Sequence, residues 1–134
     1  MMRIDKLEGV GPAYAKKLNQ AGIRTVRDLL RACGTPEGRK EVAQQTGIDG
    51  KLILRWTNMA DLFRIRGIGP QYAELLEAAG VDTVPELAQR NPENLYSKLA
   101  EVNAEKRMVK QLPTLRLVRT WVEQARKIGR RVYY

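Results

Sequence analysis

The chain has 134 residues, ordinary proportions of hydrophobic (43%) and charged (29%) residues, and a formal net charge of +9. Histidine is absent and Cys33 is the single cysteine, so zinc sites, Ser-His triads, Cys-His nucleophiles and an internal disulfide are excluded, and we expect no metal and no cofactor. No apolar run reaches the roughly 18 residues of a membrane span, and the N-terminus lacks a signal-peptide pattern, so we expect a cytoplasmic protein without membrane contact.

The sequence contains an internal repeat with an offset of 58 residues. Residues 7–12 (LEGVGP) correspond to residues 65–70 (IRGIGP), and the correspondence continues into the segments that follow. Later the offset becomes 65, because Trp56 is best matched by Trp121. The repeat therefore predicts two structural units of the same kind.

Local signals predict the same order of helices in both copies. Proline needs no backbone N–H in a first helical turn, so Pro12 and Pro70 are expected to begin helices. Gly22 and Gly80 are placed as the C-terminal caps of these helices. A Thr-x-x-acid pattern, typical of a capping box, precedes the second helix, and a Thr-Pro or Asn-Pro pair precedes the third. The expected helix starts are Pro12, Thr25 and Thr35 in the first copy, and Pro70, Thr83 and Asn91 in the second.

The last helix of each copy is predicted to be amphipathic, with apolar residues at i, i+3 and i+4 spacing. The two stripes are Leu52, Ile53, Trp56, Met59, Ala60 and Phe63, and Leu117, Val118, Trp121, Val122, Ala125 and Ile128. Both tryptophans lie in the middle of a stripe and are expected in the core. Because no segment alternates with period two over the length of a strand, we predict an all-α fold. Its two domains, residues 1–62 and 63–134, are expected to pack as one compact unit.

Basic residues are concentrated near the end of the sequence. Residues 106–134 contain 9 Lys and Arg against Glu123 alone, whereas residues 1–105 contain 15 against 14 Asp and Glu. A basic segment beside a nearly neutral body suits a polyanion, although a solvated surface has the same composition. On a helical wheel, the face opposite the Trp121 stripe gathers basic side chains that we expect to be solvated and free: Arg116, Arg119, Arg126, Lys127 and Arg130.

The two Gly-x-Gly sequences are suited to binding phosphate through the backbone. Glycine tolerates positive φ, which we expect at Gly11 and Gly69, and without a Cβ atom it lets an anion approach the backbone N–H groups. The helix that follows directs its unpaired N–H groups and the positive end of its dipole at the same place. The middle residues, Val10 and Ile68, are expected to point inward and fix the loop to the core.

Residues 7–23 (L-x-G-V-G-P-x-x-A-x-x-L-x-x-x-G-I) and 65–81 resemble the helix-hairpin-helix motif. Nearly all of residues 4–128 resemble a bacterial domain family of unassigned function built from two such units (SAM/helix-hairpin-helix-like), and residues 21–30 are similar to the C-terminal domain of the RNA polymerase alpha subunit. The resemblance implies that paired hairpins hold both strands of duplex or structured DNA across a minor groove. The implied contact residues, with the lysines beside the first hairpin, are Gly9, Val10, Gly11, Ala13, Lys16, Lys17, Gly67, Ile68, Gly69 and Gln71.

The second copy departs from the DNA-binding pattern of this family. Where the first copy has Lys16 and Lys17, the second has Glu74 and Leu75, and further acidic residues follow it at Glu77 and Asp82. We therefore expect the basic last helix to contribute more affinity for DNA than the second hairpin does. Backbone amides and point charges do not read bases, so little sequence preference is expected.

A protein-interaction module with purely structural hairpins is the alternative interpretation. An enzyme is not expected. Asp28 and Asp82 lie past the hairpins, as the catalytic aspartate of helix-hairpin-helix glycosylases does, but Asp28 is explained as the acid of a capping box. The sequence leaves open the natural partner, the choice between DNA and RNA, and the oligomeric state.

Overall fold

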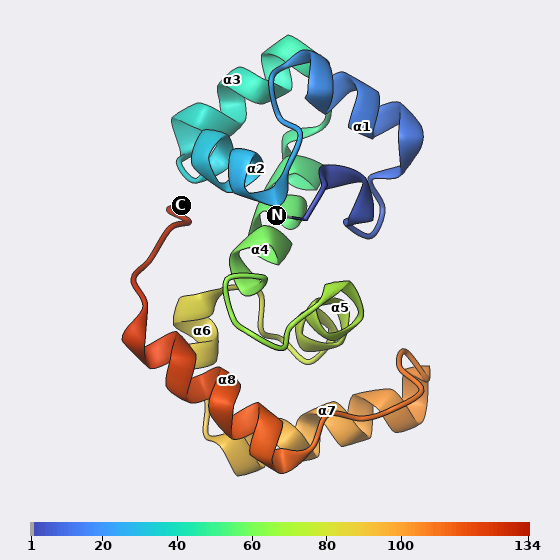
Figure 1. Cartoon of the computed structure of the whole chain (residues 1–134), viewed down its shortest axis with the longest axis vertical. Helices are drawn as coiled ribbons and strands as arrows, with labels where there is room; N and C mark the ends of the chain where they lie inside the picture. The colour runs from blue at the N-terminus through green and yellow to red at the C-terminus, as the bar shows by residue number, and fades with distance from the viewer. Residues whose placement is uncertain (1) are drawn as a thin grey trace. The chain divides into compact units, whose positions relative to one another are not determined.

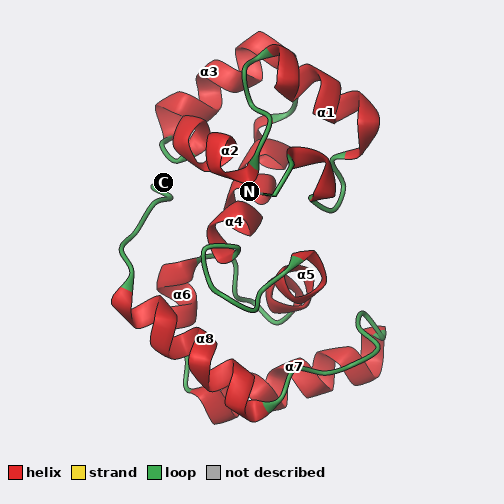
Figure 2. Ribbon diagram, viewed as in Figure 1, coloured by secondary structure: helices red, strands yellow, loops and turns green. Residues whose placement is uncertain are grey.

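The computed structural model describes residues 2–134, and in this part of the chain every regular element is a helix (Figure 2). The predicted all-α class is therefore confirmed. In chain order, the elements are the 3₁₀ helix η1 (Ile4–Lys6) and the α-helices α1 (Gly11–Gln20), α2 (Val26–Cys33), α3 (Pro36–Thr46), α4 (Gly50–Leu62), α5 (Pro70–Ala78), α6 (Val84–Ala88), α7 (Pro92–Lys106) and α8 (Leu115–Lys127) (Figure 1).

The chain divides into two compact units. Unit 1 contains the residues up to Asp61 together with Arg131–Tyr134, and unit 2 contains Leu62–Arg130. The division lies one residue from the predicted boundary, but the last four residues, grouped with the second domain by the sequence, belong to unit 1. The second repeat buries most of its apolar stripe within its own unit, since the cluster around Trp121 draws its buried members from residues 62–125.

The helix starts of unit 1 follow the predicted capping signals. The Thr25 hydroxyl accepts from the Asp28 amide while the Asp28 carboxylate accepts from the Thr25 amide, both at 3.1 Å, which completes the predicted capping box of α2. The Thr35 hydroxyl caps α3, and the Asp49 carboxylate accepts from the Lys51 amide at the start of α4. Trp56 on α4 is fully buried, as predicted.

Unit 2 repeats this order with two differences from the prediction. The Thr83 hydroxyl donates to the Glu86 carboxylate at 3.1 Å and makes no cap hydrogen bond, so the capping box expected for α6 does not form. Trp121 is fully buried on α8, but Ile128 of the same predicted stripe is 36% exposed. The reason is that α8 ends at Lys127 and Ile128 has extended backbone (φ −110°, ψ 153°), which takes it out of the helical register.

Candidate nucleic-acid interface

The first glycine loop (residues 7–11, between η1 and α1) is a tight turn anchored at its centre. Gly9 and Gly11 have left-handed backbone, with φ of +86° and +63°, which glycine adopts at the lowest cost. The Val10 amide donates to the Leu7 carbonyl at 3.2 Å, and the Val10 side chain is buried. Val10 thus fixes the loop to the core, as predicted, and its engaged amide is not available to a ligand.

The second glycine loop (residues 65–69, before α5) differs from the first at its last residue. Gly67 has φ of +94°, and the Ile68 amide donates to the Ile65 carbonyl at 3.3 Å, as in the first loop. Gly69, however, has φ −101° and ψ −173°, an extended conformation open to any residue. The prediction of positive φ is confirmed for Gly11 and wrong for Gly69, because α5 begins one position later in the repeat than α1 does.

The helices that follow the glycine loops begin without a side-chain cap. Neither α1 nor α5 receives a side-chain hydrogen bond at its N-cap, and neither does the short α6, whereas α2, α3, α4, α7 and α8 all do. The first amides of a helix have no acceptor within the helix, and Pro12 and Pro70 contribute none. The donors that remain are the backbone amides of Gly11 and Ala13 at the start of α1, and of Gly69, Gln71 and Tyr72 at the start of α5.

A buried tryptophan lies beneath the first glycine of each loop. A Cβ atom on Gly9 would lie 3.7 Å from Trp56 Nε1, and one on Gly67 would lie 3.0 Å from Trp121 Nε1. Within the described residues neither indole N–H has a hydrogen-bond partner. A tyrosine ring accompanies each indole, with centroids 5.2 Å apart in unit 1 and 5.4 Å apart in unit 2. A Cβ atom would therefore crowd the indole at Gly67, whereas at Gly9 it would make an ordinary van der Waals contact and the positive φ is the reason for glycine.

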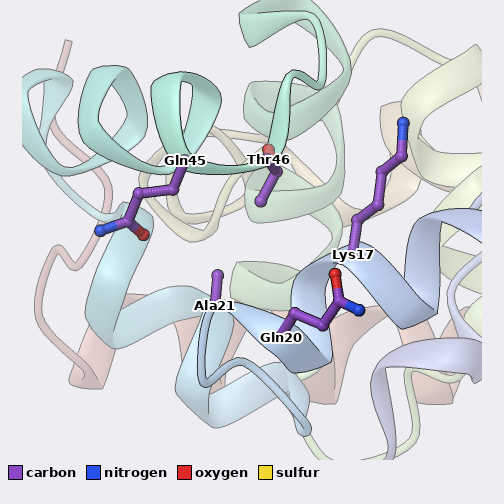
Figure 3. A pocket seen from close by; sticks show the side chains of 5 residues that line it. All are labelled: Lys17, Gln20, Ala21, Gln45 and Thr46. Carbon is purple, nitrogen blue, oxygen red and sulfur yellow. The ribbon is translucent and has the colours of Figure 1, made fainter.

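The two lysines predicted beside the first loop are exposed, but Lys17 is directed elsewhere. Lys17 lines a cavity of about 460 Å³ between the second half of α1 and the end of α3. Figure 3 shows its other lining residues, which are Gln20, Ala21, Gln45 and Thr46. Both helices end at this cavity, so their negative dipole ends meet there and do not favour an anion. The structure thus places Lys17 apart from the amides of the loop.

The basic face of α8 is only partly free. The Arg119 guanidinium lies 2.6 Å from the Glu93 carboxylate of α7, and this hydrogen bond lowers the pKa of Glu93. Arg126 donates to the carbonyl oxygens of Ala88 and Arg90 at 3.0 and 3.4 Å. The expectation of free side chains is therefore wrong for Arg119 and Arg126, because acceptors on α7, at the end of α6 and directly after α6 lie beside them.

Three further basic residues were predicted on this face. Arg116 and Lys127 are exposed on α8, and within the described part of the chain they have no ion pair or hydrogen-bond partner. Arg130 is also exposed but lies beyond the end of the helix. Arg116 and Lys127 are therefore the cations of α8 that remain available to a polyanion.

Sequence reasoning missed two residues: Arg66 in the second loop and Gln124 on α8. Arg66 directly precedes Gly67 and is exposed, and its backbone N–H and carbonyl are held by the Gln124 side chain at 2.8 and 3.2 Å. The repeat itself carried a signal, since Arg66 corresponds to Glu8 of the first copy. The acidic Glu77 lies at the far end of α5, about 10 Å along the helix axis. The second loop therefore carries an exposed cation of its own at Arg66.

Fold and loops together define an all-helical protein with two repeat-related glycine loops, each placed before an uncapped helix. The chain belongs to the family described as "Domain of unknown function (DUF4332)", whose model matches residues 8–128 and so includes the glycines of both loops and α8. This confirms the predicted resemblance to a domain family of unassigned function. No curated protein and no solved structure matches the chain significantly. Within residues 2–134, no helix combines the length and apolar character of a membrane span.

Proposed function

We propose that this protein is a tandem helix-hairpin-helix protein that binds the DNA backbone without regard to base sequence. The observation that carries the proposal is the pair of uncapped helix starts at the glycine loops, in a chain whose other long helices are capped by side chains. An uncapped helix start offers backbone N–H groups and a positive dipole end to an anion. Two such starts in a repeat suit the two strands of a duplex.

The charges around the loops support the same partner. The chain carries a net charge of +9, and exposed cations stand near the second loop at Arg66, on α1 at Lys16, and on α8 at Arg116 and Lys127. Cations of this kind position a protein on phosphates and carry no base information. The sequence contains no histidine, so it offers no catalytic group that depends on one. We propose a binding role without catalysis.

The test is a titration of labelled duplexes of unrelated sequence, followed by fluorescence anisotropy at several salt concentrations. We expect equal affinities, with a Kd of about 1 µM or weaker at physiological salt, and a log–log salt slope that steepens by about 0.9 for each phosphate neutralised. No binding at low salt, about 50 mM, contradicts the proposal and favours the protein-interaction alternative.

A negative charge introduced at the helix starts separates binding from folding. Ala13→Glu and Gln71→Glu place an acid in the first turn of α1 and α5, where it stabilises a helix by about 0.3–1 kcal/mol but repels phosphate. We expect about tenfold weaker DNA binding from each variant. Gln44→Glu, an equal charge change at an exposed position of α3, is the control. If all three variants bind alike, the loops are not the site.

A further inference from the structure

The last four residues, Arg131–Tyr134 (the tail), return to unit 1 and bind there through the main chain. The Tyr133 amide donates to the Gly34 carbonyl at 2.7 Å, and the Val132 side chain is 1% exposed. In Figure 1 the tail is the red segment that ends beside α2. The tail is thus held by its backbone and by a buried side chain, as an inserted peptide is.

Two polar side chains of unit 1 complete the contact. Arg39 is 9% exposed; its Nη1 donates to the Cys33 carbonyl at 3.0 Å and its Nη2 donates to the Tyr133 carbonyl at 2.7 Å. The same guanidinium lies 5.8 Å from the centroid of the Tyr134 ring, whose hydroxyl donates to Asn58 Oδ1 at 2.9 Å. Burying a guanidinium is costly unless its donors are paired, and a tail carbonyl supplies one of the acceptors.

Gly34 shows how closely the tail approaches. Its backbone is right-handed helical (φ −67°, ψ −23°), a conformation that any residue adopts. A Cβ atom on Gly34 would nevertheless lie 2.5 Å from the Arg131 carbonyl oxygen and 2.9 Å from the Leu30 carbonyl oxygen. Space, and not backbone conformation, therefore requires glycine here, and the tail takes up most of that space.

These contacts are the elements of extended-peptide recognition, in which main-chain hydrogen bonds hold the segment and side-chain contacts select its residues. We propose that Gly34, Arg39 and Asn58 form a peptide-binding site for an extended segment with one apolar residue and, two positions later, one aromatic residue. The tail is its tethered occupant, and a peptide of the same chemistry binds in trans once the tail is displaced. The proposal does not depend on DNA binding.

The experiment uses the full chain and a fluorescent peptide of residues 128–134, capped at both ends. Tyr133→Pro removes the amide that donates to Gly34, and Val132→Asp places a charge at a buried position, so both variants release the tail and leave the site intact. We expect them to bind the peptide with a Kd of about 1 mM or tighter. The parent chain should bind at least about tenfold more weakly, because its own tail competes at high effective concentration.

Variants of the site provide the decisive comparison. Adding Gly34→Ala or Asn58→Ala to Tyr133→Pro should abolish peptide binding, whereas adding Gly50→Ala should not, because a Cβ atom on Gly50 meets no atom within 4 Å. Helical circular dichroism and a cooperative melt verify that each variant folds. If Val132→Asp does not fold, the test uses Tyr133→Pro, which buries no charge. If the released chains do not bind the peptide, or Gly34→Ala leaves the binding unchanged, the proposal is overturned.

Discussion

At the scale of single residues, the two copies of the repeat provide a matched pair of glycines. Gly11 has φ of +63°, whereas Gly69 has φ of −101°, and neither would bring a Cβ atom within 4 Å of another group. We expect Gly11→Ala to cost about 1–2 kcal/mol of unfolding free energy, because an L-residue is strained in the left-handed region. Gly69→Ala should be neutral or stabilising by about 0.4–1 kcal/mol. Urea denaturation of both variants measures the difference, and equal effects would show that the loops do not differ in this way.

Asp82 gives a second prediction, on pH dependence. Burial, and then the carboxylates of Glu86 and Glu77, raise its pKa above the usual 3.8. A carboxyl with a raised folded pKa opposes folding when it is ionised, so this cost is present at neutral pH and disappears as the pH falls below the unfolded pKa. Asp82→Asn should therefore raise the melting temperature at pH 7, with no gain below about pH 4. Melts from pH 3 to 7 measure this, with the exposed Asp5→Asn as control; a gain that is constant with pH contradicts the explanation.

At the scale of the helix, the basic side chains of α8 fall into two groups: those with a partner in the described residues and those without one. Changing Arg116 and Lys127 together to Gln should flatten the salt slope of DNA binding by up to about 2 units if both meet phosphates. The cost in stability should stay within about 0.5 kcal/mol for each change. Anisotropy titrations at several salt concentrations, with thermal melts of the same proteins, give both quantities.

Changing Arg119 and Arg126 together to Gln is the matched control, since it removes the same charge. These side chains are held by Glu93 and by two carbonyl oxygens, so we expect a smaller change in slope. The exposed hydrogen bonds of Arg126 contribute about 0.5–1.5 kcal/mol, so this variant should lose more stability than the first. An unchanged slope in the Arg116 and Lys127 variant, with a flatter one in the control, would show that the wrong residues of α8 are assigned.

The helix starts were predictable from the sequence because their causes are local. Thr25, Thr35 and Asn91 all cap the helix that directly follows them, and Gly22 ends α1 with positive φ. Each of these signals lies within a few residues of the boundary it sets.

The partners of the candidate site were not predictable, because they join distant segments. Arg119 and Glu93 are 26 residues apart, and Arg66 and Gln124 are 58 residues apart. A helical wheel shows which side chains share a face of α8, but not which acceptors the fold brings to that face. Ile128 shows the same limit, since its place in the stripe depended on where α8 ends.

At the scale of the whole molecule, the division into two units predicts that they fold with different degrees of independence. The apolar cluster of unit 2 is drawn from residues 62–125 and needs nothing outside the fragment 62–130. We expect this fragment to unfold cooperatively. The fragment 1–61 lacks Val132, which is buried in the full chain, and it leaves Arg39 without the Tyr133 carbonyl, so it should melt at a lower temperature than 62–130 does. Calorimetry of the two fragments tests this, and a non-cooperative melt of 62–130 refutes it.

The two tryptophans beneath the glycine loops allow a spectroscopic measurement to follow each loop separately. The sequence contains two tryptophans, and each lies under the first glycine of a different loop with an indole N–H that has no hydrogen-bond partner in the described residues. A ¹⁵N-correlated NMR spectrum should therefore show two indole signals, one for each loop, in a region free of backbone resonances. A ligand that shifts the Trp56 signal alone acts on the first loop, and a ligand that shifts both signals binds both loops. The spectrum therefore shows which repeat a ligand contacts without any substitution.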